Sequence, residues 1–261
     1  MARFTAIIHV FNEEDLIAQC LESLHWVDEI LFVDTYSTDR TVEIAQEYTD
    51  RIVYHKYRNS AETKNWAIPQ ATYEWLVFLD ADEVISPELA QEIQDRAGQE
   101  EYTGYSVDRE MYFWGQPLKS TYWNPNYQMR VFHKNQARFE DKEVHAQVTL
   151  EGKSAVMEHK MYHYSYPTLS DYIAKFNRFT TFEAQQMLKD NVTFGPHHFP
   201  LKSLLRIFVA FFRFHFKHKG YKDGKGGFVL SLFSALYPFF SDAKFWELTH
   251  VKEDRLHGEN R

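Results

Sequence analysis

The sequence predicts an α/β protein built on a mixed β-sheet and followed by a helical, amphipathic C-terminal extension. Three observations support this fold class. Apolar strand-like runs alternate with helix-like segments over the first hundred residues, shorter alternating runs follow from Tyr102 to Tyr166, and basic, aromatic helical stretches begin at Leu201. The first pattern favours a parallel sheet with helices on its faces, and the second favours antiparallel strands.

Four short apolar runs predict buried strands, at residues 4–11, 29–33, 51–55 and 74–79. Helices are predicted at residues 16–24, 41–48 and 61–71, the last interrupted near Pro69, and another begins at Ser86-Pro87-Glu88. Ligands of parallel sheets bind beyond the carboxyl ends of the strands. Because Asn12, Asp34 and Asp80 follow three of these runs, we expect them to converge on one cleft. Each of them alone could instead cap the next helix.

The second half of the chain has a different pattern. Residues 105–108 and 128–132 predict antiparallel strands that complete the cleft, and residues 169–188 predict a helix. We therefore expect a first domain over residues 1–190. Its first half, at about 1–100, would contain the parallel strands, and its second half, at about 101–190, would contain the antiparallel strands and complete the cleft. Residues 191–261 are expected to form a separate helical region that associates with a membrane or a partner.

Composition narrows the functional classes. The formal net charge of −8 disfavours a generic nucleic-acid binder. Cys20 is the one cysteine, so a disulfide framework is excluded and a reducing compartment is expected. Aromatic residues make up 17% of the chain, which suggests a large apolar surface that meets sugars, lipid or a partner. We expect no signal peptide ahead of the first strand.

The strongest chemical signal is a pair of carboxylates after a buried strand. Asp80 and Asp82 are separated by one residue, follow the apolar run that ends at Leu79, and precede Glu83. A turn at this point can aim both aspartates to the same side. Hard divalent cations such as Mg²⁺ or Mn²⁺ prefer oxygen ligands and often share them with substrate phosphates. A bare Asp-x-Asp is common on solvated surfaces, but its place after a buried strand makes it far more specific.

Four segments resemble motifs of family 2 glycosyltransferases and occur in the order of that family. Residues 7–14 look like its opening strand, residues 33–41 are similar to its segment VDSGSTDGT, residues 64–67 resemble its lysine-asparagine motif, and residues 80–83 match its Asp-x-Asp. The resemblance covers about the first ninety residues. It implies a GT-A-type, Rossmann-like nucleotide-binding domain and a metal-dependent hexosyltransferase that uses a nucleotide sugar.

The resemblance also implies roles for single residues. The nucleotide-sugar pocket is implied to contain Asn12, Glu13, Asp34, Asp39, Lys64 and Asp80. Asp34 would bind the nucleobase of a uridine-type donor, and Asp80 and Asp82 would meet the ribose and the metal. Lys64 would approach the sugar or phosphate of the donor, unless it is an ordinary solvated lysine of a helix.

Later segments look like those of bacterial enzymes that glucosylate the inner core of lipopolysaccharide. They are residues 130–132, 144–145, 163–166, 175–179 and 220–227. Many of those enzymes have glutamate directly after the Val-His pair, where this chain has Ala146. An inverting transfer needs a carboxylate that takes the proton of the acceptor hydroxyl. Asp141 and Glu143 are the candidates, although the stretch could equally be a solvated loop, and His145 could orient the acceptor or act as the base.

Histidine spacing does not favour zinc. His159 and His163 have helix-type i, i+4 spacing, but residues 156–166 alternate as a strand does. A helical zinc pair is therefore not expected. His163 could still join Asp80 and Asp82 as a ligand of Mn²⁺ or Mg²⁺, or it could simply line the cleft.

The stretch from Leu201 to Lys217 predicts a basic, aromatic, amphipathic helix. Its basic residues share one side of a helical wheel, at Lys202, Arg206, Arg213 and Lys217. Such helices lie in the membrane interface beside anionic lipids. Residues 228–240 form a second apolar stretch, and both are shorter than the ~20 residues that a bilayer span needs. Packing on the first domain or in a homodimer is the alternative.

These observations together predict an inverting glycosyltransferase that moves a hexose, with glucose as the first choice, from a UDP-sugar to a glycolipid or oligosaccharide acceptor such as the lipopolysaccharide core. It would be cytoplasmic and peripheral on the inner face of the bacterial cytoplasmic membrane, without a nucleic-acid partner. A sugar nucleotidyltransferase is an alternative enzyme class. Such enzymes usually have a glycine-rich loop after the first strand, and this chain has Asn12-Glu13-Glu14 there, which counts against that class. A non-catalytic sugar- or membrane-binding homologue is disfavoured by the intact Asp80-Ala81-Asp82 but left open by Ala146.

Overall fold

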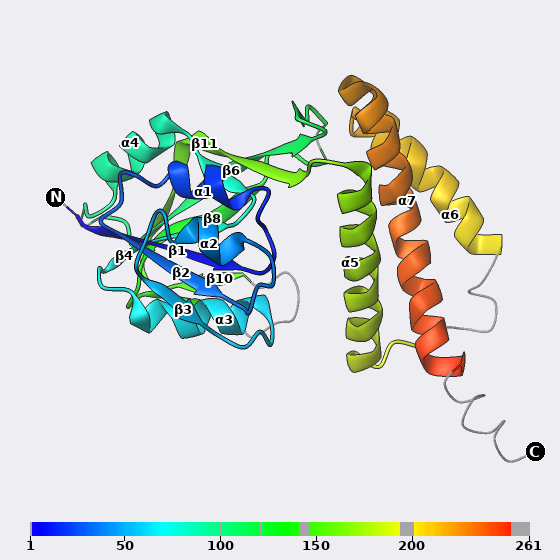
Figure 1. Ribbon diagram of the computed structural model, residues 1–261. Coiled ribbons are helices and arrows are strands. Elements are labelled where there is room, and N and C mark those ends of the chain that lie inside the picture. Colours follow the sequence, from blue (N-terminus) through cyan, green and yellow to red (C-terminus); the bar gives the residue numbers. More distant parts are fainter. Residues whose placement is uncertain (1, 100, 121, 141–146, 194–200, 252–261) are drawn as a thin grey trace, which may run out of the picture. The chain divides into compact units, whose positions relative to one another are not determined.

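The computed structural model describes residues 2–99, 101–120, 122–140, 147–193 and 201–251, and side chains are described for all of these except 201–204 and 251. Two compact units emerge from the packing of the backbone. The first comprises Met1–Tyr112 and Pro125–Ser165, and the second comprises Phe113–Asn124 and Tyr166–Arg261. Figure 1 shows the helices and strands of both units.

The first unit begins with a parallel arrangement of strands, as the alternating pattern predicts. The strands are β1 (Phe4–Val10), β2 (Glu29–Asp34), β3 (Ile52–Tyr54) and β4 (Trp75–Asp80). The helices are α1 (Ile17–Glu22), α2 (Thr41–Ala45), α3 (Ser60–Ala67) and α4 (Pro87–Arg96), and a 3₁₀ turn (Ile68–Gln70) follows α3. β1 pairs in parallel with both β2 and β4, and β2 pairs in parallel with β3.

The sheet continues into a part that contains antiparallel pairs. These elements are β5 (Glu83–Ile85), β6 (Gly104–Phe113), β8 (Tyr127–His133) and β11 (Ser154–Tyr166). The strand order is β3-β2-β1-β4-β8-β6-β11-β5, with β8 antiparallel to β4 and β6, and β5 antiparallel to β11. A small separate sheet pairs β9 (Ala137–Phe139) with β10 (Val148–Leu150). The predicted α/β fold with a mixed sheet is confirmed.

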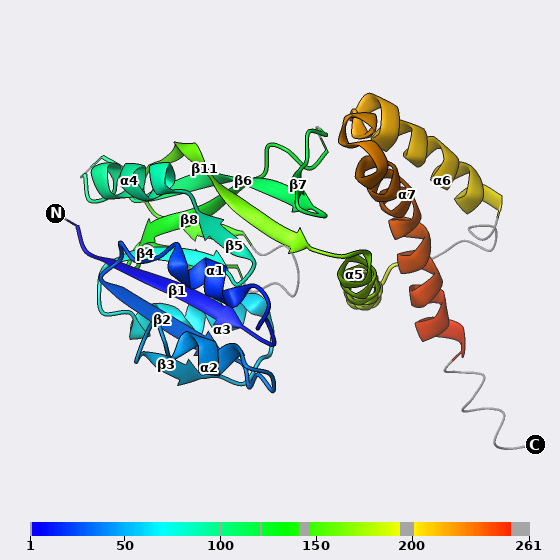
Figure 2. The same cartoon turned by 45° about the horizontal axis from the view of Figure 1, so that its top comes forward.

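Helices cover the opposite faces of the parallel strands (Figure 2), and an apolar cluster lies on each face. Successive side chains of a strand point to opposite faces. Ile8 and Val10 of β1 therefore pack with α1, α2 and α4, whereas Ile7 packs with α3. All three are at most 3% exposed, and full burial of a large apolar side chain contributes roughly 1.5–3 kcal/mol. The packed layers hold the carboxyl ends of the strands in fixed positions.

Three long helices dominate the described part of the second unit. They are α5 (Leu169–Lys189), α6 (Leu201–Phe212) and α7 (Gly224–Trp246), preceded by the short strand β7 (Gln116–Pro117). π-Helical turns follow α6 at Arg213–Lys217 and α7 at Glu247–Val251, and a 3₁₀ turn covers Gly220–Asp223. α7 lies between α5 and α6 (Figure 1). The sequence analysis expects a domain boundary near residue 190, after α5. In the structure α5 packs on α7, and the second unit already includes the chain from Tyr166 onward.

The glycine-rich segment at residues 220–227 forms a tight junction before α7. A Cβ atom on Gly227 would lie 1.9 Å from the carbonyl oxygen of Gly220, so only glycine fits there. The carboxylate of Asp223 accepts the backbone N–H of Ser120 at 3.0 Å and also that of Lys119. Among the helices of the described residues, none combines the length and the apolar character needed to cross a bilayer.

Candidate active site

Parallel pairing brings three predicted side chains to one edge of the sheet. Val10 of β1 pairs with Asp34 of β2, and His9 of β1 pairs with Asp80 of β4. Asn12 follows β1 by two residues. Since neighbouring strands lie ~4.8 Å apart, Asn12, Asp34 and Asp80 occupy adjacent positions at the carboxyl edge, as the sequence predicts.

The loops after β1 and β2 bind each other through polar side chains. Asn12 has a left-handed backbone with a φ of +52°, a conformation in which asparagine is enriched. Its Oδ1 accepts the N–H of Thr38 at 2.8 Å, and its own N–H donates to Oγ of Ser37 at 3.0 Å. The N–H of Glu13 donates to Oγ1 of Thr41 at 2.8 Å. These bonds fix the backbone around the pocket that the resemblance implies for Asn12 and Glu13.

Asp39 joins the same two loops. Its Oδ1 accepts the N–H of Thr41 at 3.0 Å and the hydroxyl of Thr41 at 2.6 Å, and its Oδ2 accepts the N–H of Glu14 at 3.2 Å. Burial works against ionisation, but these hydrogen bonds outweigh it and lower the pKa of Asp39. Asp39 thus orders the loops at the start of α2, and direct contact with a nucleotide stays a prediction.

Asp34 is fully buried, with 0% of its surface exposed. Its Oδ2 accepts the N–H of Ser37 at 2.9 Å. Its Oδ1 has no hydrogen-bond partner among the described residues. A buried acceptor without a partner costs free energy, on the order of 1–3 kcal/mol, unless a ligand or water supplies the donor. Binding of a nucleobase by Asp34 stays a prediction.

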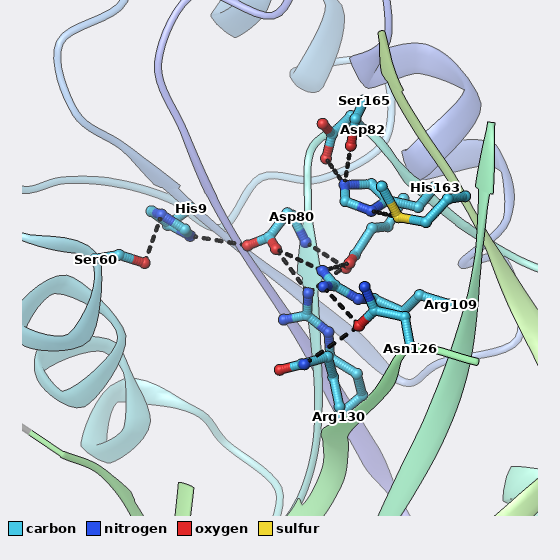
Figure 3. A network of polar contacts seen from close by, with 12 residues as sticks. His9, Ser60, Asp80, Asp82, Arg109, Asn126, Arg130, His163 and Ser165 are labelled. Atoms are coloured by element: carbon cyan, nitrogen blue, oxygen red, sulfur yellow. Dashed lines mark hydrogen bonds and ion pairs between the residues drawn. The ribbon is translucent and has the colours of Figure 1, made fainter. Parts of the chain in front are cut away.

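Asp80 lies between the cationic side chains of Lys64 and Arg130, of which Figure 3 shows Arg130. Its Oδ1 accepts from Nζ of Lys64 at 2.9 Å, and its Oδ2 accepts from the guanidinium of Arg130 at 2.6 Å. Desolvation raises the pKa of Asp80, but the charges of Arg130 and Lys64 outweigh it and hold this pKa well below its ordinary value. Asp80 is therefore ionised, and Lys64, only 7% exposed, is not a solvated helix lysine.

Glu83 is the centre of a buried ion cluster beneath Asp80. It is 0% exposed, and its Oε1 accepts from the guanidinium groups of Arg109 at 2.8 Å and of Arg130. Its Oε2 accepts the backbone N–H of Asp80 at 2.9 Å. Burial lowers the pKa of Arg130, but the charges of Asp80 and Glu83 outweigh it and leave this pKa raised. Sequence reasoning did not pair Arg109 and Arg130 with these acids, although a charge within the apolar run of β8 was a signal.

Asp82 faces His163 rather than the basic cluster. Its Oδ1 lies 3.2 Å from Nε2 of His163, and the side chains are 10% and 12% exposed. Backbone contacts hold the two together, because the N–H of Tyr164 donates to the carbonyl of Asp82 at 2.8 Å and His163 pairs with Glu83 in register. Oγ of Ser165 lies 2.6 Å from the same Nε2. The structure thus brings together the predicted residues Asp82 and His163 at the end of β4 (Figure 3).

His9 is a further site residue that sequence reasoning missed. It lies in the middle of the apolar run of β1, where a polar residue is itself a signal. Its Nδ1 is 3.9 Å from Oδ1 of Asp80, and its Nε2 is 3.4 Å from Oγ of Ser60 (Figure 3). Burial, reinforced by the charge of Lys64, lowers the pKa of His9 to about 4. The imidazole is therefore neutral at physiological pH.

The three candidates for the catalytic base lie outside the described residues. They are Asp141, Glu143 and His145, and Ala146 also belongs to this stretch. The described residues on either side are joined, since the N–H of Glu140 donates to the carbonyl of Gln147 at 2.9 Å. Within the described ranges, no group of three or more His, Cys, Asp or Glu side chains is arranged to hold a metal ion. Asp82 and His163 therefore form a pair rather than a group of three, and metal binding by this pair stays a prediction.

The order and spacing of these residues match a known family. The sequence model of glycosyl transferase family 2 matches residues 5–151, which is more than half of the chain. The chain belongs to glycosyl transferase family 2. This family membership confirms the resemblance of the four motifs and makes the protein a glycosyltransferase. The matched residues extend from within β1 to β10 and contain Lys64, Asp80, Glu83, Arg109 and Arg130, whereas His163 lies beyond them.

Two relatives match over nearly their whole length. The lipopolysaccharide core biosynthesis glycosyltransferase LpsC of Rhizobium meliloti is 27% identical over 256 residues, covering 95% of this chain and 93% of LpsC. An uncharacterized glycosyltransferase of Rickettsia typhi is 25% identical over 273 residues, covering 100% of this chain and 92% of the relative. Among solved structures, S. aureus TarS 1-349 in complex with UDP-GlcNAc is similar with a TM-score of 0.49 and 17% identity, covering 98% of this chain and 92% of TarS.

Proposed function

We propose that this glycosyltransferase moves a hexose, with glucose as the first choice, from a UDP-sugar to a glycolipid acceptor such as the lipopolysaccharide core, with inversion and with Mn²⁺ or Mg²⁺. One observation carries the proposal. At the carboxyl edge of the parallel strands, an ionised Asp80 between two cations adjoins an Asp82 that faces His163. The similarity to LpsC supports the choice of acceptor.

Asp82 and His163 have the chemistry of a partial metal site. A carboxylate oxygen and an imidazole nitrogen 3.2 Å apart can both bind one cation. Mg²⁺ in such enzymes usually has one or two protein ligands and takes the rest from water and substrate phosphates. When bound, the cation would neutralise the diphosphate and favour its departure. Asp80 remains a predicted third ligand, and it could act as one only by giving up a contact with Lys64 or Arg130.

The ionised Asp80 can also accept hydrogen bonds from the ribose hydroxyls of the donor. Lys64 and Arg130 hold its carboxylate in place at 2.9 Å and 2.6 Å, so the acceptor geometry is fixed before the nucleotide binds. We propose that the acceptor hydroxyl passes its proton to Asp141 or Glu143, with His145 as the alternative base or as an orienting group. Each is a residue type that can serve as a general base.

The outer face of α6 supports a membrane-bound acceptor. Five large apolar side chains on one stripe are exposed, with 68% for Leu205, 64% for Phe208, 61% for Val209, 46% for Phe212 and 54% for Phe216. Arg206 and Arg213 on the same segment are exposed as well. A helix with exposed apolar and basic residues suits an interface with anionic lipids. We propose that this stripe binds the inner membrane surface where a glycolipid acceptor resides, and a homodimer is the alternative occupant.

A screen of nucleotide sugars tests the donor and the metal together. Thermal unfolding and slow hydrolysis are measured with UDP-, GDP- and ADP-sugars, each with and without Mn²⁺. We expect one UDP-sugar with Mn²⁺ to raise the unfolding temperature, because a ligand of the native state stabilises it by mass action. The same UDP-sugar should be hydrolysed slowly. Stabilisation by a GDP- or ADP-sugar alone would contradict the proposed donor, and stabilisation that is independent of Mn²⁺ would contradict the proposed metal.

A further inference from the structure

A groove lies between α6 and α7, two helices that pack on each other within the second unit (Figures 1 and 2). Its volume is about 390 Å³, which falls in the range of ~300–1,000 Å³ that small-molecule sites occupy. Most of its lining is apolar, with Leu205, Val209, Ala210, Ala235, Pro238 and Phe239. Leu205 and Val209 are 68% and 61% exposed, so the groove is open to solvent along α6. An apolar site of this kind suits an apolar group of a ligand.

Three charged side chains also line the groove, those of Arg206, Arg213 and Asp242. Nη1 of Arg206 lies 3.9 Å from Oδ2 of Asp242, so these two charges partly offset each other. Arg213 lies two helical turns further along the chain from Arg206, and its side chain is exposed. The positive charge that remains in the groove is therefore at the Arg213 end.

The segment around Arg213 is basic in a chain that is acidic as a whole. Residues 201–241 contain seven Lys or Arg residues and one acid, Asp223, whereas the whole chain has a formal net charge of −8. The carboxylate of Asp223 already accepts the backbone N–H groups of two residues of the 113–124 segment. Exposed lysines follow Arg213 at positions 217, 219, 222 and 225. Such a concentration of positive charge favours an anionic group at this end of the groove.

An apolar groove with a basic end fits a ligand that has an apolar chain and an anionic head. A second copy of this chain fits less well, because a two-fold symmetric interface brings the same surface of both copies together. The basic segments would then face each other, and like charges repel. A phospholipid with a net negative charge supplies both required parts, and the guanidinium of arginine matches the geometry of a phosphate group.

We infer that the α6–α7 groove binds one molecule of an anionic phospholipid, with an acyl chain along the apolar lining and the phosphate at Arg213. The inference rests on the proposed membrane contact of α6 and deepens it. The exposed stripe of α6 would lie in the surface of the bilayer, whereas the groove would take up a single lipid. Leu205 and Val209 belong to both the stripe and the groove, so a lipid chain can pass from one to the other.

Calorimetric titration with short-chain lipids below their micelle concentrations tests the groove without a bilayer. The unaltered protein should bind dioctanoyl phosphatidylglycerol more tightly than dioctanoyl phosphatidylcholine, whose head has no net charge. Ala210→Trp should weaken the binding of both lipids about tenfold or more, because the indole fills the groove. Arg213→Gln should weaken the binding of phosphatidylglycerol alone, about tenfold, because a charged hydrogen bond to its phosphate is lost. Ala174→Trp and Arg178→Gln are the matched controls, since both residues are exposed on α5.

Thermal unfolding shows whether Ala210→Trp keeps its fold, and Arg213→Gln changes only an exposed side chain. A folded Ala210→Trp variant with undiminished affinity for both lipids would overturn the groove as the site. Unchanged affinity of Arg213→Gln for phosphatidylglycerol would overturn the place of the phosphate.

Flotation of the unaltered protein with phosphatidylglycerol vesicles separates this inference from the proposed function. Flotation without any binding of the short-chain lipid would remove the groove site and leave the proposed membrane contact in place. A protein that did not float with these vesicles would contradict the membrane contact itself.

Discussion

The two units of this protein differ in which side chains they bury and which they expose. The first unit buries charge, with Glu83 0%, Arg130 5% and Asp82 8% exposed. The described part of the second unit exposes apolar side chains instead, with Leu205, Phe208 and Val209 all above 60%. Charged residues are rarely buried without partners, and large exposed apolar patches mark interaction sites.

We propose that each unit meets its ligand where its chemistry is unusual. Buried charges in the first unit are paired, and the resulting cluster fixes Asp80 at a sheet edge of the kind where small polar molecules bind. Among the described side chains of residues 205–217, the exposed charged ones are Arg206, Arg213 and Lys217, and they accompany the exposed apolar stripe. Apolar and basic side chains together suit a lipid surface.

The largest expected effect is on activity at the proposed metal site. Asp82→Asn should lower sugar transfer or donor hydrolysis about a thousandfold, because a metal-bound leaving group is stabilised by several kcal/mol. The unfolding temperature should change by only a few degrees. Asp95→Asn on α4 is the control, since that carboxylate is exposed and accepts from Gln91. Undiminished turnover by the Asp82 variant would remove the metal proposal.

The second largest effect is expected on the free energy of unfolding, at the buried ion cluster around Glu83. Glu83→Gln should lower the free energy of unfolding by about 3 kcal/mol or more, because it leaves Arg109 and Arg130 without their shared carboxylate. Denaturant titration measures this. Glu110→Gln removes an ion pair with Lys160 whose side chains are 24% and 46% exposed, and should cost less than about 1 kcal/mol. Equal losses in both variants would show that burial of the charges does not matter.

His9 makes the stability of the first unit depend on pH. Between about pH 4 and 6.5, the unfolded chain binds a proton that the folded chain does not, because the folded pKa is lowered to about 4. Stability is therefore lost as the pH falls through this window, by at most ~3 kcal/mol at 1.36 kcal/mol per unit. His9→Gln should reduce the difference in unfolding free energy between about pH 7 and 5. An unchanged pH profile in the variant would contradict a neutral buried His9.

The smallest expected effect concerns the membrane. Phe208→Ser combined with Phe212→Ser should weaken binding to anionic vesicles about tenfold, because two exposed apolar side chains no longer enter the interface. Phe179→Ser is the control, since Phe179 is 38% exposed on α5 and α7 lies between α5 and α6. Flotation with vesicles measures both. If the double variant bound vesicles normally and instead lost a dimer in sedimentation, the α6 stripe would be a contact between copies.

Local sequence patterns were sufficient for most of the fold. The four runs of the parallel half, the antiparallel strands around residues 105–108 and 128–132, and the helix at 169–188 all correspond to observed elements. Periodicity and capping residues act over a few neighbours, so they can be recognised in one segment at a time. Errors of extent arose where such signals are weak. α2 ends at Ala45 rather than at Tyr48, and α3 ends at Ala67 rather than at residue 71. The apolar stretch at residues 228–240 is part of the longer helix α7, which spans Gly224–Trp246.

The candidate site was harder to predict because its contacts are distant in sequence. Asp80 meets Arg130 across fifty residues and Lys64 across sixteen. No local pattern shows that the third carboxylate, Glu83, turns inward to bind Arg109 and Arg130 while Asp82 faces His163. Nor does a local pattern show that Asn12 has a positive φ, since that conformation depends on the loops around it. The carboxyl-edge rule and the resemblance to the family had placed Asn12, Asp34 and Asp80 together beforehand.

We propose that a divalent cation binds at Asp82 and His163 together with the diphosphate of a UDP-sugar. Crystals soaked with Mn²⁺ and a UDP-sugar test this binding through the anomalous scattering of manganese. We predict an anomalous peak bonded to the Asp82 carboxylate and to Nε2 of His163, with diphosphate oxygens completing its coordination. A nucleotide bound at the sheet edge without any manganese beside Asp82 would contradict the claim.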